Sequence, residues 1–187
     1  MARPLIDPAV LHELLIYDAE QGSLMWRERG PKWFAVATDA PGWNAKYAAM
    51  PALSSINVSG YLRGTLLGQS LLAHRVCWAL YEGAWPISVL DHINGNRTDN
   101  RRSNLREASP AENRQNVASR SGSTSRFVGV SKHKATGRWQ AFISVGRAQR
   151  YLGLFDTEND AFSAYCAAKK KLHEFNPTPR EISHVAV

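Results

Sequence analysis

Cysteine is scarce in this sequence, and long apolar runs are missing from it. Only Cys77 and Cys166 occur among the 187 residues, each inside an apolar helical pattern. Two distant cysteines argue against a disulfide framework and against a cysteine-rich zinc site, so we expect packed thiols. No apolar run approaches the roughly eighteen residues that a membrane span needs, and the amino terminus MARPLIDPAV lacks the order of a signal peptide. These absences predict a cytoplasmic protein with no membrane partner.

Acidic side chains are outnumbered by basic ones. The chain has 16 Asp and Glu against 23 Lys and Arg, and the resulting net charge of +7 favours a polyanionic partner. The excess is uneven: residues 1–60 carry five basic and six acidic side chains, residues 61–120 eight and five, and residues 121–187 ten and five. A nucleic-acid surface is therefore expected in the last two thirds of the chain. The apolar share of 44% is typical of a folded, soluble protein.

The first 59 residues predict a short helix, a strand and a series of loops. Apolar side chains recur at helical spacing over residues 8–17, with Asp7 as N-cap and Pro8 at the first helical position. The segment SLMWRE, residues 23–28, predicts a strand. Gly, Pro and Ser recur from there to Ser59 and indicate turns and loops.

Residues 60–118 predict more regular structure. A hairpin begins at Gly60 and leads into a helix over residues 73–83. The apolar stripe of this helix comprises Val76, Cys77, Leu80 and Tyr81. After it, VLDHI predicts a strand over 89–93, GNRTDNRRS a polar loop, NLREA a second strand, and PAENRQNVAS a short helix that begins at Pro110.

The segment SRSGSTS, residues 119–125, has the composition of a flexible linker. Beyond it, RFVGVSK, GRWQAFISV and QRYLGLF predict three strands. TENDAFSAYCAAKKKLHEF predicts a helix with Thr157 as N-cap and a lysine run that complements the helix dipole. The predicted fold class is α+β.

The string from Leu90 to Asn116, LDHINGNRTDNRRSNLREASPAENRQN, resembles the HNH family of nucleases. With AHRVCW and GAWP upstream, the resemblance extends over residues 60–120. It is similar to the branch of phage and intron-encoded homing endonucleases, in which asparagine often replaces the final histidine. The resemblance implies a ββα-metal core that cuts DNA with one divalent metal ion and leaves 5′-phosphate and 3′-hydroxyl ends. It also implies a phage-encoded protein in the cytoplasm of a bacterial host.

Phosphodiester hydrolysis needs an aligned nucleophile, a base to deprotonate it, and a cation near the phosphorus. Asp91 and His92 are adjacent on a strand, so their side chains leave opposite faces and divide these tasks. The resemblance implies that Asp91 binds the metal and that His92 is the general base, which suits an imidazole at neutral pH. It also implies that Asn113 completes the metal site through its amide oxygen, and that Asn104 ties down the loop between the two strands.

The candidate catalytic set is therefore His92, Asp91, Asn113 and Asn104. A carboxylate plus an amide oxygen is a hard and sparse ligand set, which favours Mg²⁺ or Mn²⁺ over Zn²⁺. No small-molecule cofactor is expected. Four arginines surround the motif and are candidates for holding DNA phosphates, namely Arg97, Arg101, Arg102 and Arg106. His74, at the start of an apolar helix, is interpreted as a structural hydrogen-bonding residue.

Residues 126–175 resemble the plant ethylene-response-factor (AP2-type) DNA-binding domain, through FVGVS, GRWQAFI, YLGLFDT and DAFSAYCAA. In that family a three-stranded sheet packed on one helix enters the major groove. The candidate DNA-binding residues are Arg126, Lys132, Lys134, Arg138, Trp139, Arg147, Arg150 and Tyr151. FVGVS replaces the family's YRGVR, so target preference does not carry over. Trp139 fits a sheet-packing role as well as a base contact.

The sequence thus predicts a modular protein. Its parts are an accessory region (1–59), an HNH core (60–118), a linker (119–125), an AP2-like domain (126–175) and a tail (176–187). The predicted function is that of a monomeric, metal-dependent endonuclease that nicks double-stranded DNA. Two alternatives stay open: a DNA-binding regulator whose HNH site is inactive, and a nuclease that acts on RNA.

Overall fold

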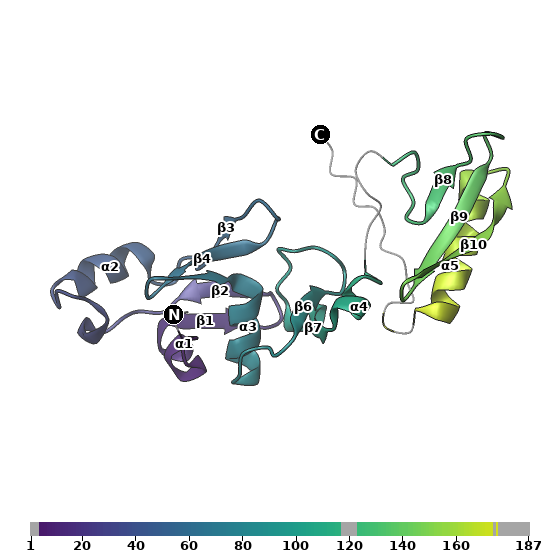
Figure 1. Ribbon diagram of the computed structural model, residues 1–187. Helices are drawn as coiled ribbons and strands as arrows, with labels where there is room; N and C mark the ends of the chain where they lie inside the picture. Colours follow the sequence, from purple (N-terminus) through teal and green to yellow (C-terminus); the bar gives the residue numbers. More distant parts are fainter. Residues whose placement is uncertain (1–3, 117–122, 174, 176–187) are drawn as a thin grey trace. The chain divides into compact units, whose positions relative to one another are not determined.

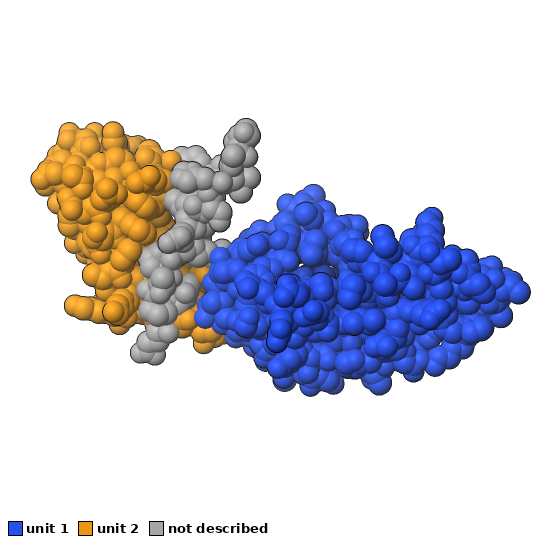
Figure 2. All heavy atoms as spheres, turned by 180° about the vertical axis from the view of Figure 1, so that it is seen from behind, with its two compact units in different colours: residues 1–107 blue, residues 108–187 orange. Residues whose placement is uncertain are grey.

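The computed structural model describes residues 4–116, 123–173 and 175. The chain forms two compact units, residues 1–107 (unit 1) and residues 108–187 (unit 2), which Figure 2 colours separately. Helices and strands are mixed, and each strand pair with a defined register is antiparallel, in agreement with the α+β class. The predicted tail and most of the predicted linker lie outside the described residues. Within the described ranges, no helix has the length and apolar character needed to cross a bilayer.

Unit 1 begins with helix α1, Pro8–Leu14. Asp7 caps it by accepting a hydrogen bond from the backbone N–H of Ala9 at 2.8 Å, as predicted. The predicted helix is wrong after residue 14, because Leu15–Asp18 form strand β1, which pairs with β2, Ser23–Trp26. Leu14 and Leu15 are both buried, so the change from helix to strand keeps both side chains in the core while β1 gains backbone pairing.

Residues 27–59 contain more regular structure than predicted. A 3₁₀ turn (η1, Pro31–Trp33), helix α2 (Asp39–Tyr47) and the short strand β3 (Ser55–Ile56) lie here. The prediction of loops is wrong for α2, whose proline falls in its first turn, where no backbone donor is needed. The ring of Trp43 on α2 packs edge-on against Trp26 at 5.9 Å. Tertiary packing therefore stabilises a helix that its local sequence disfavours.

The core of unit 1 is built around helix α3. Strands β4 (Leu62–Leu66) and β5 (Gln69–Leu72) form the predicted hairpin, β3 extends their sheet, and α3 (Ala73–Glu82) follows directly. Helix α3 ends at Gly83, whose φ is 69°, as predicted. Its buried stripe includes Cys77, a free thiol, whereas Tyr81 is exposed and the prediction is wrong there. Figure 1 shows α1 and α3 beside these sheets.

Unit 2 contains a three-stranded sheet covered by one helix (Figure 1). Its strands are β8 (Val130–Lys132), β9 (Trp139–Val145) and β10 (Ala148–Phe155), and its helix is α5 (Glu158–Leu172). The hydroxyl of Thr157 caps α5 by accepting from the backbone N–H of Asp160 at 3.1 Å, as predicted. The rings of Phe127 and Phe162 stack at 4.0 Å in its core. Three strands and a helix are confirmed, while the likeness to the AP2 family stays a prediction.

One lysine of the run at the end of α5 is buried and bound to another segment of unit 2. Lys169 is buried, and its Nζ donates a hydrogen bond to the backbone carbonyl of Gln115 at 2.5 Å. Cys166, on the same helix, is a free and half-buried thiol, so it is less packed than predicted.

Candidate functional site

Two short strands carry the adjacent Asp91 and His92. Strand β6 (Val89–His92) and strand β7 (Leu105–Ala108) form a two-stranded sheet, in the predicted strand, loop, strand order (Figure 1). The loop between them, residues 93–104, ends in a 3₁₀ turn, η2, Arg102–Asn104. A hydrogen bond from the backbone N–H of Ile93 to the carbonyl of Asn104, 2.9 Å long, closes the loop at its base.

The carboxylate of Asp91 is held by an arginine on the neighbouring strand. Asp91 is only 4% exposed, and its Oδ2 accepts hydrogen bonds from Arg106 Nη2 at 2.9 Å and Nε at 3.1 Å. Two charged donors on one oxygen hold Oδ2 of Asp91 in place. A buried carboxylate is costly without a cationic partner, and Arg106 supplies that partner for Asp91.

The imidazole of His92 is buried and oriented by an asparagine side chain. His92 is 3% exposed, and its Nε2 lies 3.1 Å from Oδ1 of Asn100, which is also buried. Because an amide oxygen only accepts hydrogen bonds, Nε2 carries the proton and Nδ1 keeps its lone pair. Burial lowers the pKa of His92 below its ordinary value, so the ring is neutral at pH 7.

Three rings meet at His92. The His74 ring packs edge-on against the His92 ring with centroids 5.1 Å apart, and Tyr61 lies 5.0 Å from His74 and 5.8 Å from His92. His74 is 5% exposed, and its Nδ1 is buried without a hydrogen-bond partner among the described residues. Burial, with the nearby His92 second, lowers the pKa of His74 to about 3. His74 is therefore a neutral packing partner of His92 at physiological pH.

The β1–β2 hairpin supports the 93–104 loop, whose Asn100 contacts His92. The hydroxyl of Tyr17 on β1 donates to the backbone carbonyl of Asn100 at 2.7 Å. Gly22, in the turn between β1 and β2, approaches the same place so closely that a Cβ there would lie 2.4 Å from the backbone nitrogen of Arg101. Residues of the predicted accessory region thus position Asn100, and through it the imidazole of His92.

Asn104 ties the loop to itself. Its Oδ1 accepts from the backbone N–H of Asn94 at 2.9 Å, and its Nδ2 donates to the carbonyl of Asp99 at 2.8 Å. The side chain of Asn94 in turn donates to the Asp99 carboxylate at 2.7 Å. These contacts set the course of the loop and leave Asn104 buried, away from solvent.

Asn113 belongs to unit 2, at the last residue of helix α4, Pro110–Asn113. Ser109 and Glu112 begin this helix with reciprocal side-chain to backbone hydrogen bonds of 3.2 and 2.7 Å. The predicted start at Pro110 is confirmed, and the helix is shorter than predicted. Asn113 donates its backbone N–H to the carbonyl of Ser109 at 2.9 Å and is half-buried.

The comparisons with known proteins identify one segment. Residues 71–115 match the family model described as HNH endonuclease. This match supports the HNH family and suggests nuclease activity on DNA. It runs from β5 through α3, β6, the 93–104 loop, β7 and α4, and so includes every residue of the candidate catalytic set. No curated protein and no solved structure matches the chain significantly.

Two arginines of the 93–104 loop brace the loop itself. Arg97 donates to the carbonyl of Ser59 at 2.6 Å, and its guanidinium lies 5.0 Å from the ring centroid of Tyr61. Arg101 binds the Asp99 carboxylate through Nε at 2.8 Å and Nη2 at 2.6 Å, which lowers the pKa of Asp99 to about 2. Both arginines are exposed, so a phosphate contact from either stays a prediction.

The other two arginines face inward from the same HNH segment. Arg102 binds the Glu82 carboxylate at 2.5 Å, and its guanidinium lies 4.3 Å from the Trp78 ring, so it joins η2 to α3. Arg106 is the partner of Asp91. For these two the structure provides an intramolecular role, and DNA contact stays a prediction.

The candidate metal ligands are few and oxygen-based. Among the described residues, no three His, Cys, Asp or Glu side chains gather as a metal site. Asp91 is the one carboxylate of the candidate catalytic set, and the resemblance adds the amide oxygen of Asn113. Mg²⁺ is commonly bound by one or two carboxylates together with water and substrate phosphate. The sparse donor set therefore fits Mg²⁺ or Mn²⁺ and does not fit a structural zinc ion.

The candidate DNA-binding residues of unit 2 divide between strands and connecting segments. Strand β8 carries Lys132, strand β9 carries Trp139, and strand β10 carries Arg150 and Tyr151. The other four candidates lie before or between the strands, namely Arg126, Lys134, Arg138 and Arg147. Alternate strand residues share a face, so Trp139 lies on the face of the buried Ala141 and Ile143. Trp139 packs against the core there, which fits its sheet-packing role. Tyr151 is opposite Phe142, on the other face of the sheet.

Sequence reasoning missed two residues of the candidate site. Asn100 stands in a polar loop with several asparagines, and nothing in that composition distinguishes the one that meets His92. Tyr61 precedes a strand and has no motif around it. His74 was recognised as a structural residue from its position at the start of an apolar helix. Its ring contact with His92 depends on the fold and could not be predicted from the sequence.

Proposed function

We propose that the protein is a metal-dependent HNH endonuclease that hydrolyses phosphodiester bonds of double-stranded DNA, with His92 as the general base. The observation that carries the proposal is the His92–Asn100 hydrogen bond of 3.1 Å within the segment that matches the HNH family. A general base must be deprotonated and aimed before substrate arrives. Asn100 aims the ring, and burial keeps it neutral.

Proton transfer follows from the tautomer of His92. Its Nε2 holds the proton that Asn100 accepts, so Nδ1 is the nitrogen that takes a proton from the attacking water. When that proton arrives, the ring becomes a cation whose Nε2–H bond to Asn100 strengthens. The neighbouring carboxylate of Asp91 also favours the charged ring, because their opposite charges attract.

We further propose that Asp91 and Asn113 hold one Mg²⁺ or Mn²⁺ ion, as the resemblance implies. When bound, the ion stabilises the charge on the phosphorus centre and on the departing 3′ oxygen. Arg106 holds Oδ2 of the Asp91 carboxylate in place for this purpose. Asn104 holds the loop, and the exposed Arg97 and Arg101 are positioned to meet phosphates.

The finer assignments rest on resemblance and charge. We propose a phage-encoded nuclease of the homing type that acts as a monomer in the host cytoplasm and nicks one strand per binding event, because one active site faces one strand. The sheet of unit 2 supplies a second DNA contact, from among the predicted residues 126–151. Two weak contacts on one DNA raise occupancy through effective concentration.

The test is relaxation of supercoiled plasmid in Mg²⁺ or Mn²⁺. The parent protein is expected to yield open circles, and His92→Ala to yield none while DNA affinity stays within about twofold, because the base is removed but no DNA contact is. His12→Ala, an exposed histidine on α1, is the matched control and should retain activity. Asp91→Ala is expected to weaken the metal dependence as well as the rate.

Three outcomes would contradict the proposal. Plasmid that stays supercoiled with the parent protein, or relaxation that is unchanged in His92→Ala, would favour a DNA-binding regulator with an inactive HNH site. Parallel digestion of RNA and DNA substrates separates the third case, since faster cleavage of RNA would make the protein a ribonuclease.

A further inference from the structure

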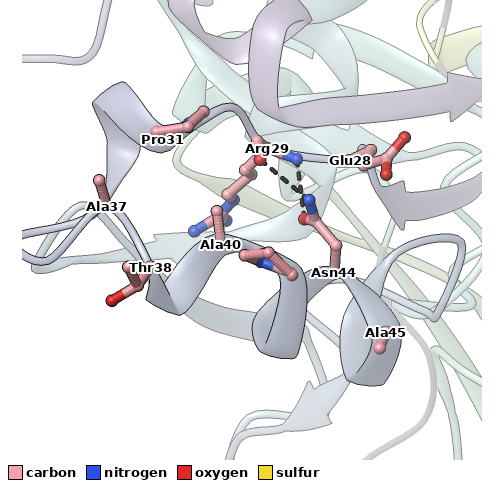
Figure 3. A pocket seen from close by; sticks show the side chains of 9 residues that line it. Glu28, Arg29, Pro31, Ala37, Thr38, Ala40, Asn44 and Ala45 are labelled. Carbon is pink, nitrogen blue, oxygen red and sulfur yellow. Dashed lines mark hydrogen bonds between the residues drawn. The ribbon is translucent and has the colours of Figure 1, made fainter.

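A pocket in unit 1 has an arginine on its wall and lies apart from the HNH site. It has a volume of about 690 Å³ and lies between helix α2 and residues 28–31 (Figure 3). Its lining includes Glu28, Arg29, Pro31, Thr38, Ala40 and Asn44. Figure 1 places α2 at the opposite end of unit 1 from β6 and β7. Neither the HNH motif nor the net charge of residues 1–60 pointed to a binding site here.

The guanidinium of Arg29 lies against two indoles that meet nearly at right angles. Its central carbon lies 4.1 Å from the ring centroid of Trp43 and 4.7 Å from that of Trp26. Nε is buried and has no hydrogen-bond partner among the described residues. No carboxylate of the described chain pairs with it within ion-pair distance, and in Figure 3 the Glu28 carboxylate points away from it. Burial accordingly lowers the pKa of Arg29.

Asn44 holds the arginine in place. Its Oδ1 accepts from the backbone N–H of Arg29 at 2.9 Å, and its Nδ2 donates to the backbone carbonyl of Arg29 at 3.0 Å, as the dashed lines of Figure 3 show. With its backbone held by Asn44 and its guanidinium in contact with two indoles, Arg29 loses little further freedom when a ligand binds. A preorganised cation of this kind binds an anion without a large ordering cost.

We propose that this pocket binds a phosphoryl group through the guanidinium of Arg29. A partly desolvated cation without a counter-charge is unfavourable, and an anion in the pocket removes that cost. The edge of a guanidinium matches two phosphate oxygens with parallel hydrogen bonds. The volume suits a nucleotide-sized ligand. The phosphoryl group belongs either to a DNA backbone that runs along unit 1 or to a free phosphate compound, and the experiment separates these sources.

The experiment is a tryptophan fluorescence titration of the full chain. Binding next to Trp26 and Trp43 changes their emission, and the probes are inorganic phosphate, deoxyadenosine monophosphate, acetate and a short DNA duplex. The parent protein is expected to bind the phosphate probes, and Arg29→Gln to bind them at least about tenfold more weakly. Arg27→Gln, an exposed arginine two residues away, is the matched control and should bind like the parent.

The variants keep the proposal testable if one of them fails to fold. Should thermal unfolding show that Arg29→Gln is unfolded, Arg29→Lys decides, because it keeps the charge but loses the planar fork, and about tenfold weaker phosphate binding is expected. An Arg29-dependent duplex affinity well above that of free phosphate identifies the DNA backbone, and equal affinities identify a free phosphate compound.

The proposal is overturned if inorganic phosphate produces no saturable change, if folded Arg29 variants bind phosphate like the parent, or if acetate binds as tightly as phosphate. None of these readings involves DNA cleavage, so the result is independent of the nuclease test with His92→Ala.

Discussion

Replacing Gly22 by alanine is expected to slow DNA cleavage even though Gly22 is outside the HNH segment. Its φ is 70°, and an added Cβ would lie 2.4 Å from the backbone nitrogen of Arg101 and 2.7 Å from the carbonyl carbon of Asn100. Neither atom is on a side chain that can rotate away, so the β1–β2 turn and the 93–104 loop must separate. Left-handed alanine costs about 1 kcal/mol by itself. The collision adds a displacement on the order of 1 Å.

This displacement reaches the proposed base through one residue. Tyr17 holds the Asn100 carbonyl at 2.7 Å, and the Asn100 side chain holds His92 at 3.1 Å, so a shift of the loop changes the aim of the imidazole. A misplacement of about 1 Å at a catalytic group can cost as much as roughly a hundredfold in rate. We therefore expect Gly22→Ala to lower kcat between about tenfold and a hundredfold while DNA affinity changes little.

Single-turnover plasmid nicking with protein in excess measures this effect, and urea unfolding checks that the variant is folded. Gly83→Ala is the matched control, because Gly83 has a φ of 69° and no atom within 4 Å of its added Cβ. It imposes the same backbone strain without the collision. If folded Gly22→Ala and Gly83→Ala nick at the same rate, the proposed support of His92 by the first hairpin is wrong.

Two further predictions concern pH, and one concerns DNA affinity. The pKa of His74 is about 3 in the fold against an ordinary 6.5, so the unfolded chain binds the extra proton and stability declines as pH falls from 6.5 towards 3. His74→Gln should flatten that decline by up to about 1.4 kcal/mol per pH unit in urea unfolding, and an unchanged slope would contradict the assignment. The lowered pKa of His92 should place the acid limb of the cleavage rate below pH 6.5, and a limb above pH 7 would argue against His92 as the base. Arg147 lies in an exposed turn of the unit 2 sheet, and Arg147→Gln should weaken DNA binding and reduce the slope of log affinity against log salt concentration by about one. Lys171→Gln, on the exposed side of α5, is the control and should change neither quantity. Equal losses in the two variants would reject the sheet as the DNA surface.

The local sequence was sufficient to predict those features that neighbouring residues decide. The caps at Asp7 and Thr157, the helix end at Gly83 and the order of strand, loop and strand around Asp91 all depend on neighbours within a few positions. The change from helix to strand after Leu14 depends on pairing with β2, and helix α2 depends on the packing of Trp43. Apolar periodicity could not predict either, because both are stabilised by distant residues.

The sequence by itself determined the chemistry that we propose for this protein. The proposed base and the proposed oxygen ligands follow from the adjacent Asp91 and His92, with Asn104 and Asn113 at the spacing of the HNH motif, because those functions depend on residue type and order. Only the tertiary structure decided which groups hold that chemistry in position. Three residues support His92 from elsewhere in the sequence, namely Asn100, Tyr17 and Gly22, and Tyr17 is 75 positions away. The contacts of Tyr17 and Gly22 exist only because separate hairpins pack together. Burial, which keeps His92 neutral, is likewise a property of the packed fold.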